Sequence, residues 1–140
     1  MFYRANVAQS GKSWLVTFPD CEGCLTEGGS RKEALVNAHE ALEGWLEAHL
    51  VQGMAPPRPK ARRGGDLIEV NPTLSAVLQI RWRREEMELT QGALAKRAGI
   101  SQQQIAKLEN PDGNPTVASL QKVAEALGLR LELTLAPAER

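Results

Sequence analysis

The strongest constraint on the fold lies in residues 89–108, which carry the signals of two short helices joined by a tight turn. Thr90 is placed to cap the first helix, and Gly99 follows it where a chain leaves a helix through positive φ. Ser101 and Gln104 then have the spacing of a capping box, in which each side chain accepts a backbone N–H from the other residue. The sequence therefore predicts a helix-turn-helix here.

The second predicted helix has one apolar side and one polar side. At about 100° per residue, Ile105 and Leu108 fall together on the inward side. Outward glutamines can contact adenine through paired hydrogen bonds in the major groove, and an outward lysine can reach guanine or a phosphate. The N–H groups of the first turn of the preceding helix, at Gln91, remain free for a phosphate. Double-stranded operator DNA is thus the predicted partner. The predicted contacts are Gln91, Ser101, Gln102, Gln103, Gln104 and Lys107.

This stretch, with three consecutive glutamines on a short capped helix, resembles the lambdoid phage repressors and the wider Cro/repressor helix-turn-helix family. The resemblance covers residues 75–127. It implies that Gln91 holds a phosphate. It assigns base reading to Gln102, Gln103 and Lys107. The sequence departs from the family pattern after Glu109, where residues 110–114 replace the usual short loop.

Composition limits the class of protein. The chain has 140 residues, 42% of them hydrophobic, which is enough for one ordinary domain or two small ones. It has no run of about 18 apolar residues and no signal-peptide pattern, so we expect a cytoplasmic location and no membrane partner. Net charge is zero, so any field that attracts DNA is local. Residues 1–56 carry 4 basic and 7 acidic side chains, whereas residues 74–140 carry 9 and 8.

Cys21 and Cys24 form a C-x-x-C pair, which can be a redox dithiol or half of a zinc site. Neither interpretation is favoured. There is no second cysteine pair, and His39 and His49 lie on faces of a predicted helix that do not suit one tetrahedral site. We expect two packed thiols, with no catalytic residue, no metal site and no cofactor.

The first half is predicted to be a small α+β domain. Residues 2–8 and 13–18 are β-prone runs separated by a hairpin turn, and residues 24–27 are a third strand candidate. Ser30 and Glu33 have the spacing of a capping box that opens a long helix with one apolar stripe. We expect a small antiparallel sheet covered by this helix.

Residues 56–66 are rich in proline, arginine and glycine and cannot continue that helix. They predict a linker between a first domain of residues 1–55 and a second domain of residues 67–140. The second domain is expected to be helical around the helix-turn-helix, with short flanking strands. Residues 67–70 are the first of these strand candidates.

The last strand candidate, residues 129–135, has leucine at every second position and thus one apolar face. A single strand cannot satisfy its own backbone, so its partner is either residues 67–70 or the same strand of a second copy. We hypothesise a homodimer or higher homo-oligomer joined through these strands. It would present two recognition helices roughly 34 Å apart, which is one turn of DNA.

Residues between 11 and 46, with the core F-P-D-x-x-G-C-x-T from Phe18 to Thr26, resemble the HicB antitoxin family. The resemblance covers residues 3–57. It implies a truncated ribonuclease-H-like domain that binds a small HicA-type toxin, an mRNA-cleaving protein, and covers the active site of that toxin. It also implies that the DNA-binding domain represses the shared operon. We expect no enzyme, because an active ribonuclease-H site needs several carboxylates that converge on metal ions, whereas Asp20, Glu22 and Glu27 crowd around one turn.

The carboxylates nearest the matched core are Asp20, Glu22 and Glu27. They are the candidate toxin contacts, because an acidic first half complements a basic RNA-binding partner. Two other functions remain open. A transcriptional repressor whose first domain senses a small ligand predicts a polar-lined pocket. An enzyme that uses the dithiol predicts loss of function when Cys21 and Cys24 become serine.

Overall fold

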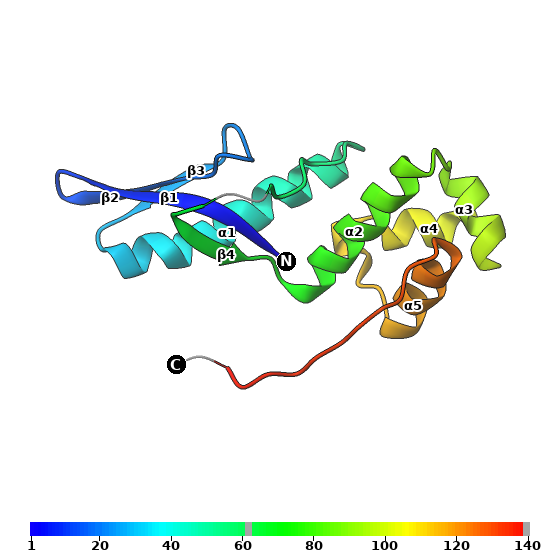
Figure 1. Cartoon of the computed structure of the whole chain (residues 1–140). Helices are drawn as coiled ribbons and strands as arrows, with labels where there is room; N and C mark the ends of the chain where they lie inside the picture. Colours follow the sequence, from blue (N-terminus) through cyan, green and yellow to red (C-terminus); the bar gives the residue numbers. More distant parts are fainter. Residues whose placement is uncertain (61–62, 139–140) are drawn as a thin grey trace. The chain divides into compact units, whose positions relative to one another are not determined.

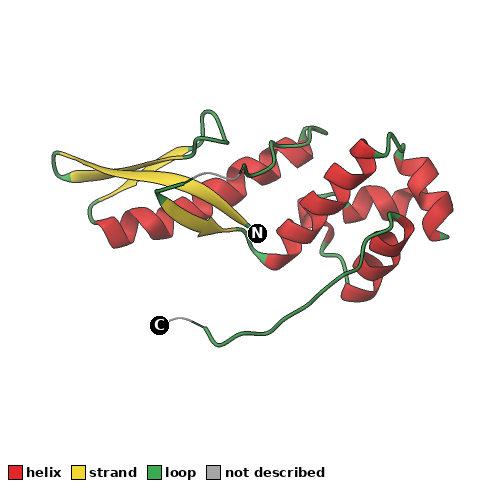
Figure 2. Cartoon of the chain, in the orientation of Figure 1, coloured by secondary structure: helices red, strands yellow, loops and turns green. Residues whose placement is uncertain are grey.

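A computed structural model describes residues 1–60 and 63–138 (Figure 1). The chain divides into two compact units, unit 1 of residues 1–79 and unit 2 of residues 80–140. Unit 1 contains the whole sheet, and unit 2 is helical (Figure 2). Ala61 and Arg62 of the predicted linker, and the last two residues of the predicted second domain, lie outside the described residues.

The sheet of unit 1 has four antiparallel strands in the order β3-β2-β1-β4. Its strands are β1 (Phe2–Ser10), β2 (Ser13–Thr17), β3 (Leu25–Gly28) and β4 (Asp66–Glu69). The hairpin between β1 and β2 turns at Gly11, whose φ of +61° lies in the left-handed region that favours glycine. The predicted first three strands and their antiparallel arrangement are therefore confirmed.

The strand predicted at residues 67–70 pairs within the chain. Tyr3 lies opposite Ile68 in an antiparallel register, and the Val70 N–H donates to the Met1 carbonyl at 3.0 Å. Ile68 is 1% exposed, so this strand also contributes to the core of unit 1. The predicted division at residue 67 therefore differs from the observed one, because β4 completes the sheet formed by the start of the chain.

Helix α1 (Arg31–Val51) lies along one face of the sheet (Figure 2). The Ser30 hydroxyl caps it by accepting the Glu33 N–H at 3.1 Å. Gly28 of β3 lets the helix start close to the strand, because a Cβ there would lie 2.4 Å from the Ala34 nitrogen. The helix buries one residue per turn against the sheet. These residues are Ala34, Ala38, Leu42, Leu46 and Leu50.

The described part of the predicted linker packs on unit 1. Pro56 is buried, and the Tyr3 hydroxyl donates to the Pro57 carbonyl at 2.6 Å. The Lys60 N–H donates to a carboxylate oxygen of Asp20 at 3.0 Å. These contacts hold residues 56–60 against unit 1. They belong to the connection from α1 to β4, and the boundary between the units falls within α2 (Pro72–Glu86).

Unit 2 contains the end of α2 and three further helices with a short 3-10 turn. They are α3 (Gln91–Ala98), α4 (Gln102–Leu108), η1 (Pro111–Gly113) and α5 (Val117–Ala126). Apolar side chains from every helix close its core. The fully buried ones are Leu94, Ile105, Val123 and Leu127. Burial of these side chains is the main source of stability for such a small helical unit.

The strand predicted at residues 129–135 is wrong for the single chain. Residues 128–138 contain no strand, and the tail, drawn in orange to red, leaves unit 2 as extended chain (Figure 1). Leu133 is 64% exposed and Leu135 is fully exposed. The alternating pattern is present, but neither β4 nor any other described segment supplies the backbone partner that a strand needs.

Candidate functional site

The turn between α3 and α4 is fixed by local hydrogen bonds. The Thr90 hydroxyl accepts the Ala93 N–H at 3.0 Å, which caps α3. Gly99 ends α3 with φ of +67°, in the left-handed region. The predicted capping box is confirmed, because Ser101 Oγ accepts the Gln104 N–H at 3.1 Å and Gln104 Oε1 accepts the Ser101 N–H at 2.8 Å.

Helix α4 separates its core residues from its polar residues as the sequence predicts. Ile105 and Leu108 are buried, whereas the three glutamines and Lys107 are exposed. Ser101 and Gln104 use their side chains to hold the start of the helix. Gln102, Gln103 and Lys107 are the side chains on α4 whose polar ends remain available for an external acceptor or donor.

Gln102 has a particular neighbour at the start of α3. A Cβ placed on Gly92 would lie 3.4 Å from Gln102 Oε1. The side chain of Gln102 therefore lies beside the first turn of α3, where N–H groups without helical partners attract anions. The predicted phosphate-binding residue, Gln91, is the first residue of that same turn.

A buried ion cluster joins the predicted phosphate-binding residue to the rest of unit 2. Glu109, the residue that ends α4, has a side chain that is 2% exposed. Arg84 Nε and Nη2 donate to its two oxygens at 2.7 Å and 2.8 Å, and Arg81 Nη1 donates at 3.3 Å. Gln91 Nε2 donates to the same carboxylate at 3.4 Å.

Sequence reasoning missed Arg81 and Arg84. Their spacing of three residues places both on one side of α2, and this spacing is the only local signal of a shared partner. Their acceptor, Glu109, lies more than twenty residues further along the chain. A carboxylate this deeply buried is tolerated only when its charge is paired and its oxygens are hydrogen-bonded.

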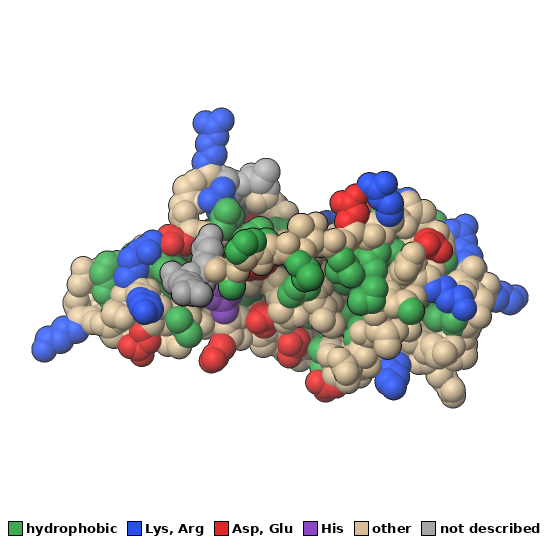
Figure 3. Space-filling view, turned by 90° about the horizontal axis from the view of Figure 1, so that it is seen from below, with side chains coloured by type: hydrophobic (Ala, Val, Ile, Leu, Met, Phe, Trp, Pro, Cys, Tyr) green, Lys and Arg blue, Asp and Glu red, His purple; other side chains and the backbone are tan. Residues whose placement is uncertain are grey.

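The loop after α4, where the sequence departs from the repressor pattern, forms η1. The Asn110 side chain accepts the Asp112 N–H at 2.9 Å, and Gly113 packs against the backbone of α4. A cavity of about 390 Å³ opens beside this loop. Its lining includes Lys107 and Lys122 with hydroxyls from the start of α5. Basic side chains also stand out from the surface of unit 2 in the space-filling view (Figure 3).

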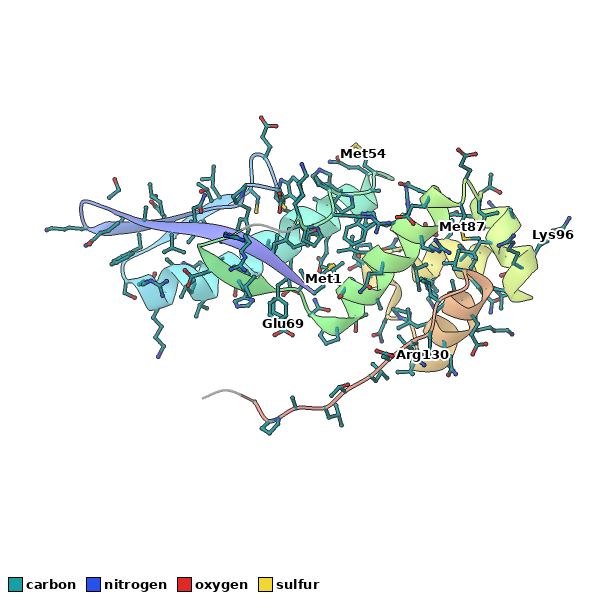
Figure 4. All side chains as sticks on the ribbon, in the orientation of Figure 1. Met1, Met54, Glu69, Met87, Lys96 and Arg130 are labelled. Carbon is teal, nitrogen blue, oxygen red and sulfur yellow. The ribbon has the colours of Figure 1, made fainter. Side chains whose placement is uncertain are left out.

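Basic side chains lie at the C-terminal end of α3. Lys96 and Arg97 are in the last turn and are exposed, and Lys96 points away from the helix (Figure 4). Cations at this end of a helix favour its dipole. Unit 2 therefore carries exposed positive charge near the helix-turn-helix, although the net charge of the whole chain is zero.

The three candidate carboxylates of unit 1 have different surroundings. Asp20 is 7% exposed and accepts the Lys60 N–H, so its charge helps to hold the connection from α1 to β4. Glu22 and Glu27 are exposed. Of the three, only Glu22 and Glu27 present their carboxylates to an external partner.

The two thiols beside these carboxylates are packed, as the sequence predicts. Cys21 is fully buried and Cys24 is 5% exposed, and the Cys24 N–H closes a turn on the Cys21 carbonyl at 3.0 Å. Burial raises the pKa of Cys21 to about 12 and that of Cys24 to about 11. Both thiols are therefore protonated near neutral pH, which makes them poor nucleophiles and poor metal ligands.

The histidines of α1 make structural contacts. His39 Nδ1 bonds to the Glu69 carbonyl at 3.1 Å, at the edge of β4. His49 Nδ1 bonds to the Trp45 carbonyl at 2.9 Å, and the rings of His49 and Trp45 are in tilted contact, with centroids 4.0 Å apart. Within residues 1–60 and 63–138, no group of three histidine, cysteine, aspartate or glutamate side chains is placed to hold a metal ion.

Residues 3–71 match the sequence model of a family described as HicB_like antitoxin of bacterial toxin-antitoxin system. Residues 80–133 match a model described as Helix-turn-helix. Over its first half the chain is therefore similar to the HicB-like antitoxin family. The match ends at residue 71, two residues after β4, so it spans the four-stranded sheet and α1.

Named relatives extend over both units of this HicB-like chain. It is 29% identical over 122 residues to Antitoxin HicB 1 of Photorhabdus laumondii subsp. laumondii, covering 87% of this chain and 78% of that protein. It is 28% identical over 123 residues to Antitoxin HicB of Escherichia coli K12, covering 87% and 89%. A chain in the solved HicA3 and HicB3 toxin-antitoxin complex is 27% identical, with a TM-score of 0.44, covering 51% of this chain and 100% of that one.

The Helix-turn-helix match covers the helices of unit 2. Residues 80–133 include α3, α4 and the capping residues Thr90 and Ser101. Across the described part of the HicB-like chain, no helix is long and apolar enough to cross a membrane.

Proposed function

We propose that this chain is an antitoxin that neutralises a HicA-type, mRNA-cleaving toxin and represses its own operon. The observation that carries the proposal is the joining of a HicB-like unit to a capped helix-turn-helix with exposed glutamines. Unit 1 would bind the toxin and cover its active site. Unit 2 would bind double-stranded operator DNA in the major groove.

In the DNA-binding role, α4 is the recognition helix. Gln102 and Gln103 are exposed at its start and would read adenines, and Lys107 would contact guanine or phosphate. Gln91 would hold a phosphate with the free N–H groups of the first turn of α3. Ser101 and Gln104 support these contacts by fixing the start of the helix.

We also propose that the active form is a homodimer or higher homo-oligomer. Residues 129–135 keep one apolar face, and no described segment of the single chain pairs with them as a strand. The same segment of a second copy is then the natural partner. Such a dimer would place two recognition helices roughly 34 Å apart, to suit a palindromic operator.

In the toxin-binding role, Glu22 and Glu27 supply negative charge beside the matched core, and Asp20 holds the adjacent turn. A basic RNA-binding partner would be attracted to this side of unit 1. We propose that unit 1 is a truncated ribonuclease-H-like domain that acts by binding alone. Protonated thiols and histidines in structural hydrogen bonds support a role without catalysis. The proposed setting is the cytoplasm.

Co-expression tests the proposal. The full chain is produced together with the basic, toxin-like protein encoded in the adjacent reading frame, and growth is followed. We expect rescue of growth and a complex that co-elutes in gel filtration. Failure of both, with both proteins produced and folded, would overturn the antitoxin role.

Footprinting on the upstream promoter tests repression separately. We expect protection of a palindrome by the full chain. If the promoter is not protected while growth is still rescued, the chain is an antitoxin without the proposed autorepression.

A further inference from the structure

Glu109 occupies a position from which one carboxylate reaches three elements. It ends α4, it accepts hydrogen bonds from Arg81 and Arg84 of α2, and it accepts one from Gln91 at the start of α3. Its oxygen Oε2 accepts from Arg84 Nε, and Oε1 accepts from Arg84 Nη2, Arg81 and Gln91. The bond to Gln91 is the longest of the four, at 3.4 Å.

The strong contacts of this cluster hold the carboxylate in place. The two bonds from Arg84 are short, and the side chains of Arg84 and Arg81 are 10% and 11% exposed. Arg84 Nη1 also donates to the Leu89 carbonyl at 2.8 Å, which ties the cluster to the turn before α3. A paired guanidinium and carboxylate in this fork geometry have little freedom to reorient.

The weaker contact sets the orientation of Gln91. A glutamine amide carries two N–H donors and one carbonyl acceptor, and it can turn by 180° unless a partner fixes it. Glu109 is an acceptor only, so it selects the orientation that turns Nε2 inward. The second N–H of Nε2 is then left for another acceptor, beside the free N–H groups of the first turn of α3.

We propose that Glu109 is a positioning residue for DNA binding: held by Arg84 and Arg81, its buried carboxylate fixes the amide of Gln91 with one N–H directed to a DNA phosphate. The inference rests on the proposed operator binding. Glu109 itself would not touch DNA. It would couple the end of the recognition helix α4 to the contact that Gln91 of α3 makes with a DNA phosphate. It also gives the two arginines an internal role.

The test uses Glu109→Asp in the full chain. Aspartate keeps the charge that Arg84 needs, but it is one methylene shorter and draws the carboxylate away from Gln91. The matched control is Glu125→Asp, because Glu125 is exposed on α5 and also accepts a glutamine amide at 3.4 Å. We expect Glu109→Asp to bind promoter DNA about 3- to 10-fold more weakly, as for one lost hydrogen bond, and the control to bind as the unchanged chain does.

The coupling is measured with Gln91→Ala. If Glu109 acts through Gln91, adding Glu109→Asp to Gln91→Ala causes no further loss of DNA binding, and each single variant loses the same phosphate in ethylation interference. If Glu109→Asp weakens binding equally with and without Gln91, its role is only structural and the inference is overturned.

A measurement on the unchanged chain keeps the inference testable if Glu109→Asp does not fold. In the nuclear magnetic resonance spectrum of the free protein, one Nε2 proton of Gln91 should exchange with solvent more slowly than the Nε2 protons of Gln103, which is exposed on α4. Addition of promoter DNA should shift the other. If both Nε2 protons of Gln91 exchange as fast as those of Gln103, the inference is overturned. If the unchanged chain does not bind promoter DNA at all, the proposed DNA-binding function is overturned. The measurement on the free protein then tests only the hydrogen bond between Gln91 and Glu109.

Discussion

At the scale of single residues, burial controls the chemistry of the two cysteines. Cys21 and Cys24 look like a reactive pair in the sequence, but both thiols are buried, and the Cys24 thiol donates to the Ala41 carbonyl of α1 at 3.6 Å. The folded state favours the protonated form of each thiol. The stability that the two protonated thiols contribute is therefore lost only as pH rises.

Stability should fall as the solution becomes alkaline. The pKa values of Cys21 and Cys24 rise from 9.0 to about 12 and about 11, so the thiols stabilise the fold fully below about pH 9 and lose this effect as pH rises toward the folded-state values. The free energy of unfolding, measured by urea titration at pH values from about 8 to 11, should decline with pH in the unchanged chain. In Cys24→Ala this decline should be shallower by up to roughly 1.4 kcal/mol per pH unit. Equal slopes for both proteins would contradict this explanation.

The exposed glutamines of α4 should affect specific DNA binding alone. We expect Gln102→Ala and Gln103→Ala each to lose about 1 to 3 kcal/mol on promoter DNA and little on unrelated DNA, because each removes contacts to base edges. Titrations on both DNAs at one salt concentration measure the difference. Gln121→Ala on α5 is the matched control, and it should bind both DNAs normally. Similar losses on both DNAs for Gln102→Ala would show that it does not read bases.

At the scale of elements, the sequence predicted the helix caps and turns, because these are fixed by contacts between residues close together in the chain. Thr90, Gly99 and Ser101 identify the turn of the helix-turn-helix because each acts within four residues of its partner. The pairing of β4 with β1 and the acceptor of Arg84 depend on residues far apart in the chain, and a single sequence carries no local mark of them. The strand predicted at residues 129–135 is wrong for a related reason. Alternating apolar residues predict a strand with one apolar face, but they do not identify the strand with which it pairs.

The η1 loop should tolerate no side chain at Gly113. A Cβ at this position would lie 1.8 Å from the Lys107 carbonyl oxygen, so the backbone of α4 or of the loop must move. We expect Gly113→Ala to lower the free energy of unfolding by about 1 to 3 kcal/mol in a urea titration.

Gly44→Ala is the matched control for this change. Gly44 is exposed on α1 and has no neighbour within 4 Å of the added carbon, so the same substitution should raise stability by about 0.5 to 1 kcal/mol. Equal effects of the two substitutions would mean that the close approach at Gly113 relaxes without cost.

Side chains from α1 protect both edges of the sheet. Asn37 donates to the Glu27 carbonyl of β3 at 2.9 Å, and His39 bonds to the Glu69 carbonyl of β4 at 3.1 Å. Unpaired carbonyls at a sheet edge invite pairing with other chains. One helix therefore covers a face of the sheet and also limits pairing at both of its sides.

At the scale of the whole molecule, the first unit should need residues well beyond the helix that covers its sheet. A fragment of residues 1–79 contains β4 and should unfold cooperatively, whereas a fragment of residues 1–57 lacks Ile68 and Val70 and leaves one edge of β1 unpaired. We expect the shorter fragment to be largely unfolded by circular dichroism. A stable fold for residues 1–57 would show that β4 is dispensable.

The tail should control oligomeric state. If residues 129–135 pair between copies, the full chain sediments as a dimer or larger species, and deletion of residues 129–140 gives a monomer with weaker binding to a palindromic promoter, because two linked contacts are lost. A chain with lysine in place of Leu131 and Leu133 is a milder test of the same face. Dimers that persist after the deletion would place the contact elsewhere.

The place of β4 in the sheet also sets the timing of folding during synthesis. Tyr3 pairs with Ile68, so the N-terminal strand is made long before its neighbour exists. Nascent chains fold as their segments emerge from the ribosome. A polypeptide released before Asp66 would therefore carry the proposed toxin-contacting carboxylates on an unfinished sheet. If the proposed toxin is cutting messages, products truncated before β4 would be poor binders, and only translation beyond about residue 79 would yield a competent neutralising domain.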